Sequence, residues 1–208
     1  ASRLEADLHC RQREYRFHGK MTLRVSLGIC MAIFTWLVAI AEGWISGLIG
    51  FLNGAEPETL DPSIITGQPE GRIVNALFEG LCAYDENGQP SPGVAESWEI
   101  SPDGKTYTFH IRTNAKWSDG FPLKAQDFVK SWHHTLKPET GSQYNYQLYP
   151  IKNAQAFAEG KLADFSEVGV HAVDDRTLRV DLENPTSYFL QLCAFPTLHP
   201  LPVDLIKR

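Results

Sequence analysis

An uncharged apolar stretch spans residues 25–41, and it limits the fold of this chain more than any other feature of the sequence. A basic flank precedes the stretch, and Ala39-Ile40-Ala41 closes it with the small-x-small pattern of a signal-peptidase site. We therefore predict that residues 21–41, which begin with a methionine, form a signal peptide that is cleaved before Glu42. Residues 1–20 are then upstream sequence and take no part in the fold.

Two other interpretations of the stretch stay open. The first is a retained membrane anchor, because 17 residues is the short end of what crosses about 30 Å of hydrocarbon. The second is a buried core helix. Lipidation at Cys30 is rejected, since Ile29 stands where a lipobox has a small residue. We expect export to the periplasm or cell envelope, with membrane contact only through the leader.

The charge of the whole chain, −6, hides an uneven distribution. Residues 1–24 hold six of the 19 basic and three of the 25 acidic side chains. Residues 42–208 therefore hold 13 basic and 22 acidic side chains, a net charge of −9. Such a surface repels phosphates, which argues against a nucleic-acid partner. The hydrophobic share of 43% is that of a globular chain and argues against wholesale disorder.

Two cysteines, Cys82 and Cys193, lie in the predicted body, 111 residues apart. Both have apolar neighbours, where a free cysteine behaves as a small hydrophobic residue. We predict two buried thiols. A disulfide between them stays open as the alternative, because exported proteins fold in an oxidising compartment.

The body reads as an α+β fold, since strands and helices are interspersed without a regular βαβ rhythm. Apolar residues Ile73, Leu77 and Leu81 predict one face of a helix that begins near Glu70. Pro92-Gly93 is expected to separate a turn from a short helical segment. The other predicted elements are strands at residues 48–52 and 106–112, a turn at 85–88, a hairpin over 168–182, and helices at 125–136, 153–159 and 187–193.

Several strings in this body resemble, in order, those of a known family. The strings are Asn53-Gly54-Ala55-Glu56-Pro57-Glu58-Thr59-Leu60-Asp61-Pro62, Leu77-Phe78-Glu79-Gly80-Leu81, Pro92-Gly93-Val94-Ala95-Glu96-Ser97-Trp98, Trp117-Ser118-Asp119-Gly120, Ala125-Gln126-Asp127-Phe128-Val129 and Asp174-Asp175-Arg176-Thr177-Leu178. The family that they resemble is the extracytoplasmic peptide-binding and oligopeptide-binding proteins of ABC importers, solute-binding protein family 5, and the resemblance covers residues 50 to about 205.

The resemblance implies a two-lobed binding protein of which this chain is an N-terminal portion. Residues 42–78 would begin the core of lobe I, and residues 79–203 would form its small mixed α/β appendage subdomain. Residues 204–208 would be a truncated return to lobe I, and lobe II would be absent. Trp98 and Trp117 are expected to be large apolar anchors of the subdomain core.

The resemblance also implies which residues line the cleft between the lobes. Thr66, Gly67 and Gln68 fall where the family offers main-chain groups to an extended peptide, in the manner of strand addition. Thr66 replaces an acidic residue that some oligopeptide binders have, which puts in doubt any neutralisation of a basic ligand. The alternative is an ordinary surface loop at residues 64–69.

Two aromatic residues complete the predicted ligand-binding set. Tyr144 matches a family tyrosine that faces the peptide, although Tyr146 and Tyr149 compete for that role and Tyr144 has an alternative place in the core or at the rim. Phe195 falls where some relatives have a cleft histidine, and it either lines the cleft or packs inside. The aromatic ring weakens any polar contact there.

Other candidate sites are weak. His133-His134 invites a metal site, but adjacent helical residues point about 100° apart, whereas two ligands of one ion need i, i+4 spacing. The acid pairs Asp85-Glu86 and Asp174-Asp175 stand at polar turns, which argues against acid–base catalysis. We therefore expect no enzyme activity, no cofactor and no metal.

The sequence thus predicts a fragment of the substrate-binding component of an ABC-type peptide import system. Its expected partners are short peptides and the permease subunits of a transporter, and we expect a monomer. The alternatives are a truncated relic that binds nothing and a binder of another solute, such as a nickel complex or haem. Without an opposing lobe, the chain by itself is expected to bind peptides with Kd of about 1 mM or weaker.

Overall fold

The computed structural model describes residues 53–203, which belong to a compact unit of residues 48–208. The predicted signal peptide at residues 21–41 and the predicted strand at residues 48–52 lie outside the described residues. Among the described helices, none combines the length and the apolar character that crossing a bilayer requires.

A four-stranded antiparallel sheet forms the framework, in the order β3-β4-β6-β5. The predicted strand at residues 106–112 is confirmed as β4 (Thr106–Ile111), whose Tyr107, Phe109 and Ile111 are buried while the residues between them are half-buried. The predicted hairpin is confirmed as β5 (Val170–Ala172) and β6 (Thr177–Asp181). Alternation of apolar and polar residues therefore identified the central strands correctly.

Strand β3 (Ala95–Ile100) corrects the helical segment that we predicted after Pro92-Gly93. Its Trp98 pairs with Phe109, and its Ile100 pairs with Tyr107, so β4 provides the backbone partners of β3, with a shift of register between Ala95 and Ser97. The two charged residues in β3 obscure the alternation of apolar and polar residues that identifies a strand. The strand is stabilised by its pairing with β4, which a reading of the β3 residues alone does not reveal.

A second, two-stranded sheet precedes β3 and consists of β1 (Cys82–Tyr84) and β2 (Pro90–Pro92). The predicted turn between them is confirmed. The Asp85 carboxylate accepts the backbone N–H groups of Asn87 and Gln89, both at 2.8 Å, and Gly88 has φ of 72°. This positive φ is a conformation that glycine adopts without strain.

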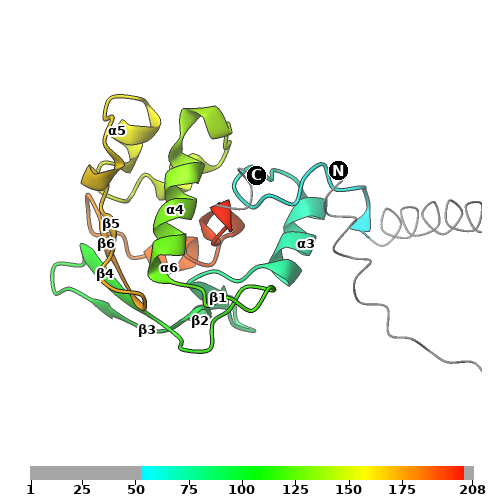
Figure 1. The fold of residues 1–208 in the computed structure, drawn as a ribbon, viewed down its shortest axis with the longest axis horizontal. Helices are drawn as coiled ribbons and strands as arrows, with labels where there is room; N and C mark the ends of the chain where they lie inside the picture. Colours follow the sequence, from blue (N-terminus) through cyan, green and yellow to red (C-terminus); the bar gives the residue numbers. More distant parts are fainter. Residues whose placement is uncertain (1–52, 204–208) are drawn as a thin grey trace, which may run out of the picture. The chain divides into compact units, whose positions relative to one another are not determined.

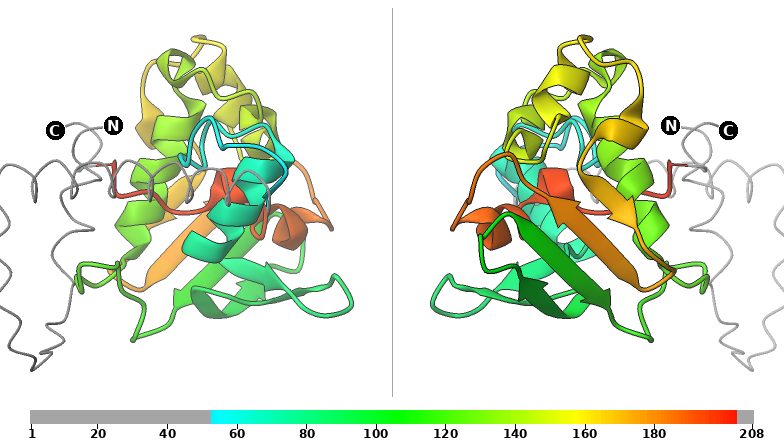
Figure 2. Two further views of the ribbon diagram at one scale, coloured as in Figure 1. Left: turned by 90° about the vertical axis from the view of Figure 1, so that its right-hand side faces the viewer. Right: turned by 90° about the vertical axis from the view of Figure 1, so that its left-hand side faces the viewer.

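Helix α4 (Ala125–Leu136) has the bounds that helical spacing predicted, and it packs against β5 and β6 (Figures 1 and 2). Its start is fixed by Asp127, whose carboxylate accepts the backbone N–H of Lys124 at 2.9 Å. The two other predicted short helices are confirmed as α5 (Ala154–Ala158) and α6 (Phe189–Leu192). Within residues 53–203 there are also four 3₁₀ helices: η2 (Pro138–Thr140), η3 (Asn145–Leu148), η4 (Phe165–Glu167) and η5 (Pro196–Leu198).

Helix α3 (Gln68–Leu77) exists as predicted, but its predicted buried face is wrong. The structure buries Glu70 and Val74, whereas Leu77 is 63% exposed. Leu81 is buried, yet it lies beyond the end of the helix. Helical spacing identifies an apolar stripe, but it does not say on which side the rest of the molecule lies.

One continuous core joins the sheet, α4, α5, α6 and η5. Stacked and tilted rings from β4 and α6 form its centre, where the ring centroids of Tyr107 and Phe189 lie 5.0 Å apart. Trp98 and Trp117 pack against this core as expected, each partly buried. The predicted burial of Cys82 and Cys193 is confirmed, and both are free thiols in the structure.

Candidate functional site

The segment before α3 is a compact turn held by Asp61. Its carboxylate accepts the backbone N–H and the hydroxyl of Ser63 at 2.9 and 2.6 Å, and its carbonyl accepts the backbone N–H groups of Ile64 and Ile65. Pro62, Ser63 and Ile65 are buried beneath the turn. This turn fixes the path of the chain just before Thr66, the first residue of the predicted ligand loop.

Gly67 is the N-cap of α3, and the carboxylate of Glu70 folds back over it. A Cβ atom at position 67 would lie 2.0 Å from Glu70 Oε2, so a larger residue there would displace this carboxylate. Glu70 accepts the backbone N–H of Glu58 at 3.0 Å, and this hydrogen bond lowers the pKa of the carboxyl group. The Glu70 side chain thereby ties the extended segment before the turn to the first turn of α3.

A buried hydrogen bond joins the turn to a segment that lies 79 residues further along the chain. The Ser142 hydroxyl donates to the carbonyl oxygen of Ser63, and both residues are buried. Ser142 stands two residues before Tyr144, and Ser63 stands three residues before Thr66. The hydrogen bond therefore brings the two predicted parts of the ligand site to the same region of the molecule.

Tyr144 and Phe195 are in direct contact. Their ring centroids lie 6.0 Å apart, edge to face, and the ring of Tyr146 lies 6.0 Å from Tyr144 on another side. Tyr144 and Phe195 are half-buried, whereas Tyr146 is 52% exposed. Such edge-to-face pairs hold aromatic rings in fixed orientations. The three rings form an aromatic cluster at the starts of η3 and η5.

Helix α4 holds η5, and with it Phe195, in place. The Trp132 ring nitrogen donates to the Leu198 carbonyl at 2.9 Å, and the Ser131 hydroxyl accepts the Leu201 N–H at 2.7 Å. Helix α3 and 3₁₀ helix η3 also contact η5. The C-terminal segment of the described chain, with η5, therefore lies between α4 and α3 (Figure 1).

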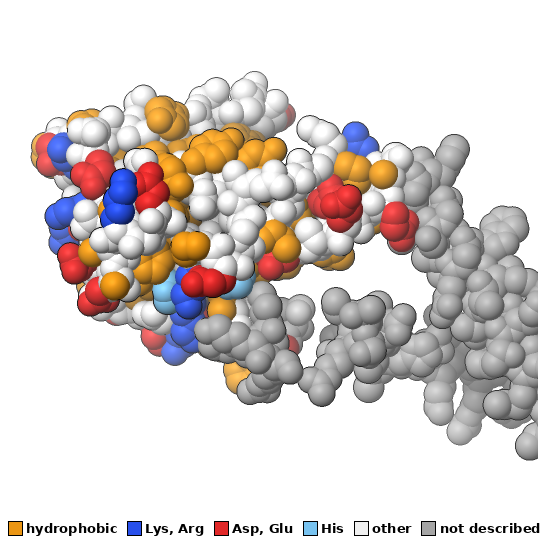
Figure 3. Space-filling model, turned by 90° about the horizontal axis from the view of Figure 1, so that it is seen from above, with side chains coloured by type: hydrophobic (Ala, Val, Ile, Leu, Met, Phe, Trp, Pro, Cys, Tyr) orange, Lys and Arg blue, Asp and Glu red, His pale blue; other side chains and the backbone are white. Residues whose placement is uncertain are grey.

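The predicted residues thus fall into two groups that neighbouring segments connect. Thr66 and Gln68 are exposed and Gly67 is half-buried, so main-chain and side-chain groups of this loop reach solvent. Tyr144 and Phe195 contact each other, and their link to the loop runs through Ser142 and Ser63. Seen from above, the molecule has hydrophobic and uncharged areas that lie between groups of acidic and basic side chains (Figure 3).

The segments around the site carry very little charge. Residues 62–69, 141–151 and 184–203 contain no Asp, Glu, Lys or Arg. The one histidine among them, His199, is buried, and burial lowers its pKa to about 4. These three segments are therefore uncharged near pH 7, although the Glu70 carboxylate lies against Gly67 at their edge.

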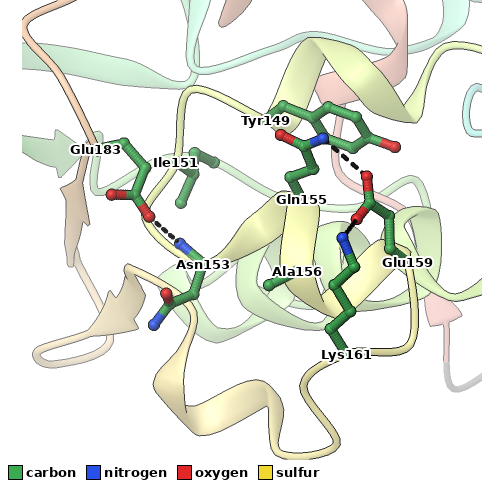
Figure 4. Close-up of a pocket in the computed structure, with 8 residues that line it drawn as sticks. All are labelled: Tyr149, Ile151, Asn153, Gln155, Ala156, Glu159, Lys161 and Glu183. Carbon is green, nitrogen blue, oxygen red and sulfur yellow. Dashed lines mark hydrogen bonds and ion pairs between the residues drawn. The ribbon is translucent and has the colours of Figure 1, made fainter.

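A hollow of about 340 Å³ lies elsewhere, beside α5 (Figure 4). None of the five predicted residues lines it, and its polar groups already bind one another. Glu159 forms an ion pair with Lys161 and accepts a hydrogen bond from Gln155 at 2.8 Å. Glu183 accepts the backbone N–H of Asn153 at 2.9 Å. Because these groups are satisfied, the hollow provides little chemistry for a ligand.

Comparison with known proteins assigns the chain to a family. The profile of the bacterial extracellular solute-binding proteins, family 5 Middle, matches residues 89–206, which is more than half of the sequence. The chain belongs to the family 5 solute-binding proteins. The family we inferred from the sequence motifs is therefore confirmed, and family 5 is a family of binding proteins.

Individual family 5 relatives match the chain closely. The periplasmic oligopeptide-binding protein OppA of Escherichia coli K12 is 42% identical over 193 residues, which cover 88% of this chain and 35% of that protein. A probable deoxycholate-binding periplasmic protein of the same strain, YgiS, is 45% identical over 158 residues. This match covers 75% of this chain and 29% of YgiS. The chain therefore spans about a third of the length of these relatives.

A solved family 5 structure confirms the fold. The crystal structure of Haemophilus influenzae OppA in complex with the peptide RPPGFSPFR has a TM-score of 0.71 and 43% sequence identity. The match covers 74% of this chain and 30% of that one. The predicted α+β class, and the prediction that the chain matches part of a lobe of a larger binding protein, are both confirmed.

The other candidate sites have structural roles in this family 5 chain. His133 lies against the rings of Phe157 and Phe165, with centroids 5.5 and 4.4 Å away. Asp174 accepts two backbone N–H groups of its turn, and Asp175 forms an ion pair with Lys124 at 2.8 Å. Over residues 53–203, no group of three potential ligands is placed to hold a metal ion.

The sequence analysis missed the residues that hold the segments of the candidate site in place. Glu70 had a recognisable signal, since a glutamate three residues after an N-cap is half of a capping box, here with Gly67 in place of serine or threonine. Ser63 and Ser142 had none, because a hydrogen bond between residues 79 positions apart leaves no local pattern.

Proposed function

We propose that this chain is part of the substrate-binding component of an ABC-type import system for peptides. Its match to OppA over 193 residues is the observation that carries the proposal. Thr66, Gly67 and Gln68 would pair with the main chain of an extended peptide, and Tyr144 and Phe195 would cover part of it. In the complete protein the ligand would lie between this part of lobe I and an opposing lobe.

The uncharged segments that carry the predicted site residues support a ligand that is held through its backbone. An extended peptide presents N–H and C=O groups along both edges whatever its side chains are, so main-chain pairing gives affinity without selecting a sequence. Charged residues near the site would select oppositely charged side chains. Their absence from residues 62–69, 141–151 and 184–203 favours a broad peptide range on this side of the cleft.

Deoxycholate is a second candidate ligand, because YgiS is 45% identical to this chain. A bile acid is a rigid apolar ring system with one carboxylate, and it would use the aromatic cluster at Tyr144, Tyr146 and Phe195 rather than main-chain pairing. A peptide would therefore depend on main-chain groups of the predicted site, whereas deoxycholate would depend on its aromatic side chains.

The remaining parts of the proposal concern the cell. The chain would be exported to the periplasm or cell envelope and would deliver its ligand to the permease subunits of the transporter. The names of OppA and YgiS, both described as periplasmic, support this location. Residues 42–78 would begin the lobe I core, and residues 79–203 would form its small subdomain.

The experiment is a titration of the isotopically labelled 208-residue chain with a mixture of tripeptides to pentapeptides, and separately with deoxycholate, followed by NMR. We expect weak peptide binding, with Kd of about 1 mM or weaker, because one side of a cleft holds only one edge of the ligand. The amide signals of Thr66, Gly67 and Gln68 should shift, while those of Asn153 and Glu159 at the α5 hollow should not. Shifts confined to the α5 hollow would refute the proposed site.

A pair of tyrosine variants sharpens the test. Tyr144→Ala should weaken peptide binding by about 0.5–1.5 kcal/mol, because an aromatic contact is lost. Tyr188→Ala is the matched control, since Tyr188 is 53% exposed at the start of α6 and has no predicted role. Equal effects of the two variants would count against Tyr144. Deoxycholate binding that depends on Tyr144, without peptide binding, would favour the second candidate.

A further inference from the structure

The thiols of Cys82 and Cys193 lie next to each other in the core, although 111 residues separate them in the sequence. Both side chains belong to the same buried core. Their backbones also meet, since the N–H of Cys82 points to the carbonyl oxygen of Cys193 at 3.5 Å. A disulfide requires Cα atoms about 4.4–6.8 Å apart, and a direct backbone contact is compatible with that separation.

The surroundings hold the two backbones together. A Cβ atom at position 80 would lie 2.5 Å from the Cys193 carbonyl oxygen and 3.0 Å from that of Cys82, so the chain approaches closely only because residue 80 is glycine. The Tyr84 hydroxyl donates to the Gln191 carbonyl at 2.9 Å and joins β1 to α6 a second time. We call this contact between β1 and the end of α6 the β1–α6 seam.

The folded seam protects the thiols. Cys82 is 1% exposed and Cys193 is fully buried. Burial raises the pKa of the Cys193 thiol well above its ordinary value, and the neighbouring Cys82 thiol raises it further. Because the thiolate is the reactive form, the folded and reduced pair reacts slowly with oxidants.

We propose that Cys82 and Cys193 form a structural disulfide when the chain folds in contact with a disulfide oxidant. One cysteine thiolate attacks the disulfide of the oxidant, which releases the first thiol of the oxidant and leaves a mixed disulfide. The second cysteine thiolate then attacks the mixed disulfide at the protein sulfur and releases the second thiol. Two thiols of the protein are oxidised, one disulfide of the oxidant is reduced, and each thiolate has lost its proton to solvent.

The order of events follows from burial. Oxidation takes place while the β1–α6 seam is forming, when both thiols still reach solvent and are already held near each other. Once the seam closes, the disulfide is enclosed in the core and resists reduction by small thiols. The inference is independent of which solute the protein binds.

The test uses the full chain with Cys10→Ser and Cys30→Ser, so that only the pair remains. The chain is unfolded with reductant and then refolded in a mixture of oxidised and reduced glutathione. After an acid quench it is denatured and treated with a maleimide, and its mass is measured. We expect most refolded chains to carry no maleimide, and a peptide digest should link the Cys82 peptide to the Cys193 peptide.

Two controls make the outcome specific. Cys82→Ala and Cys193→Ala, each in the same background, should carry one maleimide per chain. The unfolded chain kept in urea with the same glutathione mixture should form the link at least about tenfold less, because only the fold raises the effective concentration of one thiol at the other. Two maleimides on the refolded chain, a stable glutathione adduct, or equal linkage in urea would overturn the proposal.

A thermal measurement provides a second readout. The linked chain should unfold about 10 °C above its reduced form, because a disulfide across a loop of this length restricts the unfolded chain. The chain with Cys82→Ala and Cys193→Ala together should show the same midpoint with and without reductant. A linked chain that melts at or below the midpoint of the reduced chain would also contradict a structural role.

Discussion

His199 is an uncharged histidine in the interior near the β1–α6 seam. It is 5% exposed, and its ring lies against Gly80, where a Cβ atom would come within 2.8 Å of it. Burial lowers its pKa to about 4, although a hydrogen bond to the Ala194 carbonyl acts in the opposite direction. Its Nδ1 has no hydrogen-bond partner. The imidazole is therefore a neutral core group at pH 7.

This histidine should make the protein sensitive to mild acid. The unfolded imidazole takes up a proton near pH 6.5, whereas the folded one stays neutral until about pH 4, so acid favours the unfolded chain within this window. Between about pH 7.5 and about pH 5 we expect His199 to lower the free energy of unfolding by about 2 kcal/mol. Urea denaturation at the two pH values measures the change.

The comparison of two variants isolates this contribution. His199→Gln cannot titrate and should lose about 2 kcal/mol of the pH dependence. His171→Gln, at an exposed position on β5, should keep the dependence of the unaltered chain. If the His199→Gln chain shows the same pH dependence as the His171→Gln chain, the imidazole is not neutral in the fold.

At the scale of elements, the contact between α4 and η5 determines where Phe195 lies. The hydroxyl of Ser131 is buried, donates to the Asp127 carbonyl at 2.6 Å and accepts the Leu201 N–H. Ser131→Ala should lower the free energy of unfolding by about 1–3 kcal/mol, because it leaves the buried Leu201 N–H without an acceptor. Chemical denaturation measures the loss.

The matched control for this prediction is Ser118→Ala at an exposed turn, which should change stability by less than about 0.5 kcal/mol. The Phe195 signals in NMR spectra should shift in the Ser131→Ala chain and stay in place in the Ser118→Ala chain. A stable Ser131→Ala chain with unchanged Phe195 signals would show that α4 does not hold η5.

Helices and strands were predicted correctly where the alternation of apolar and polar residues within the element itself shows which face is buried. Helix α4 and strand β4 each show their own period, because each lies with one face on the core. Strand β3 was missed and the buried face of α3 was misassigned, since both depend on what lies beside them. The ladder partner of Trp98 is Phe109, and the face of α3 that is buried carries Glu70 and Val74 rather than Leu77.

At the scale of the whole molecule, stability should be uneven. The main core extends from Leu81 to Leu198 and takes in side chains of β4, α4 and α6, whereas α3 adds none to it. The only fully buried apolar side chain of α3 is Val74. We therefore expect the amide of Val74 to exchange with solvent at least about tenfold faster than those of Phe109 and Trp132, because elements with few buried contacts open locally.

Native-state hydrogen exchange measures this order. Val74→Ala should speed exchange in α3 further and leave the protection of Phe109 unchanged. Leu77→Ala is the control within the same helix, since Leu77 is 63% exposed and should affect α3 much less. Equal protection of α3 and β4 would show that the two unfold as one unit.

The candidate site was predictable only through resemblance to a family. Main-chain groups at Thr66, Gly67 and Gln68 have no side-chain signature, and the competition among Tyr144, Tyr146 and Tyr149 is not resolved by spacing. What brings the parts near each other is the bond from Ser142 to Ser63 and the ring contact from Tyr144 to Phe195. Both join residues about 50 to 80 positions apart, and such pairings are set by the whole fold.

The meeting of Cys82 with Cys193 has one more consequence. Residues 82–193 form a long excursion of the chain, which starts at β1 and ends just after α6. The two ends of this excursion are in contact through the backbones of Cys82 and Cys193. Residues 82–193 therefore enter and leave at one place, as an inserted subdomain does, although Trp132 and Ser131 within them also hold the chain that follows.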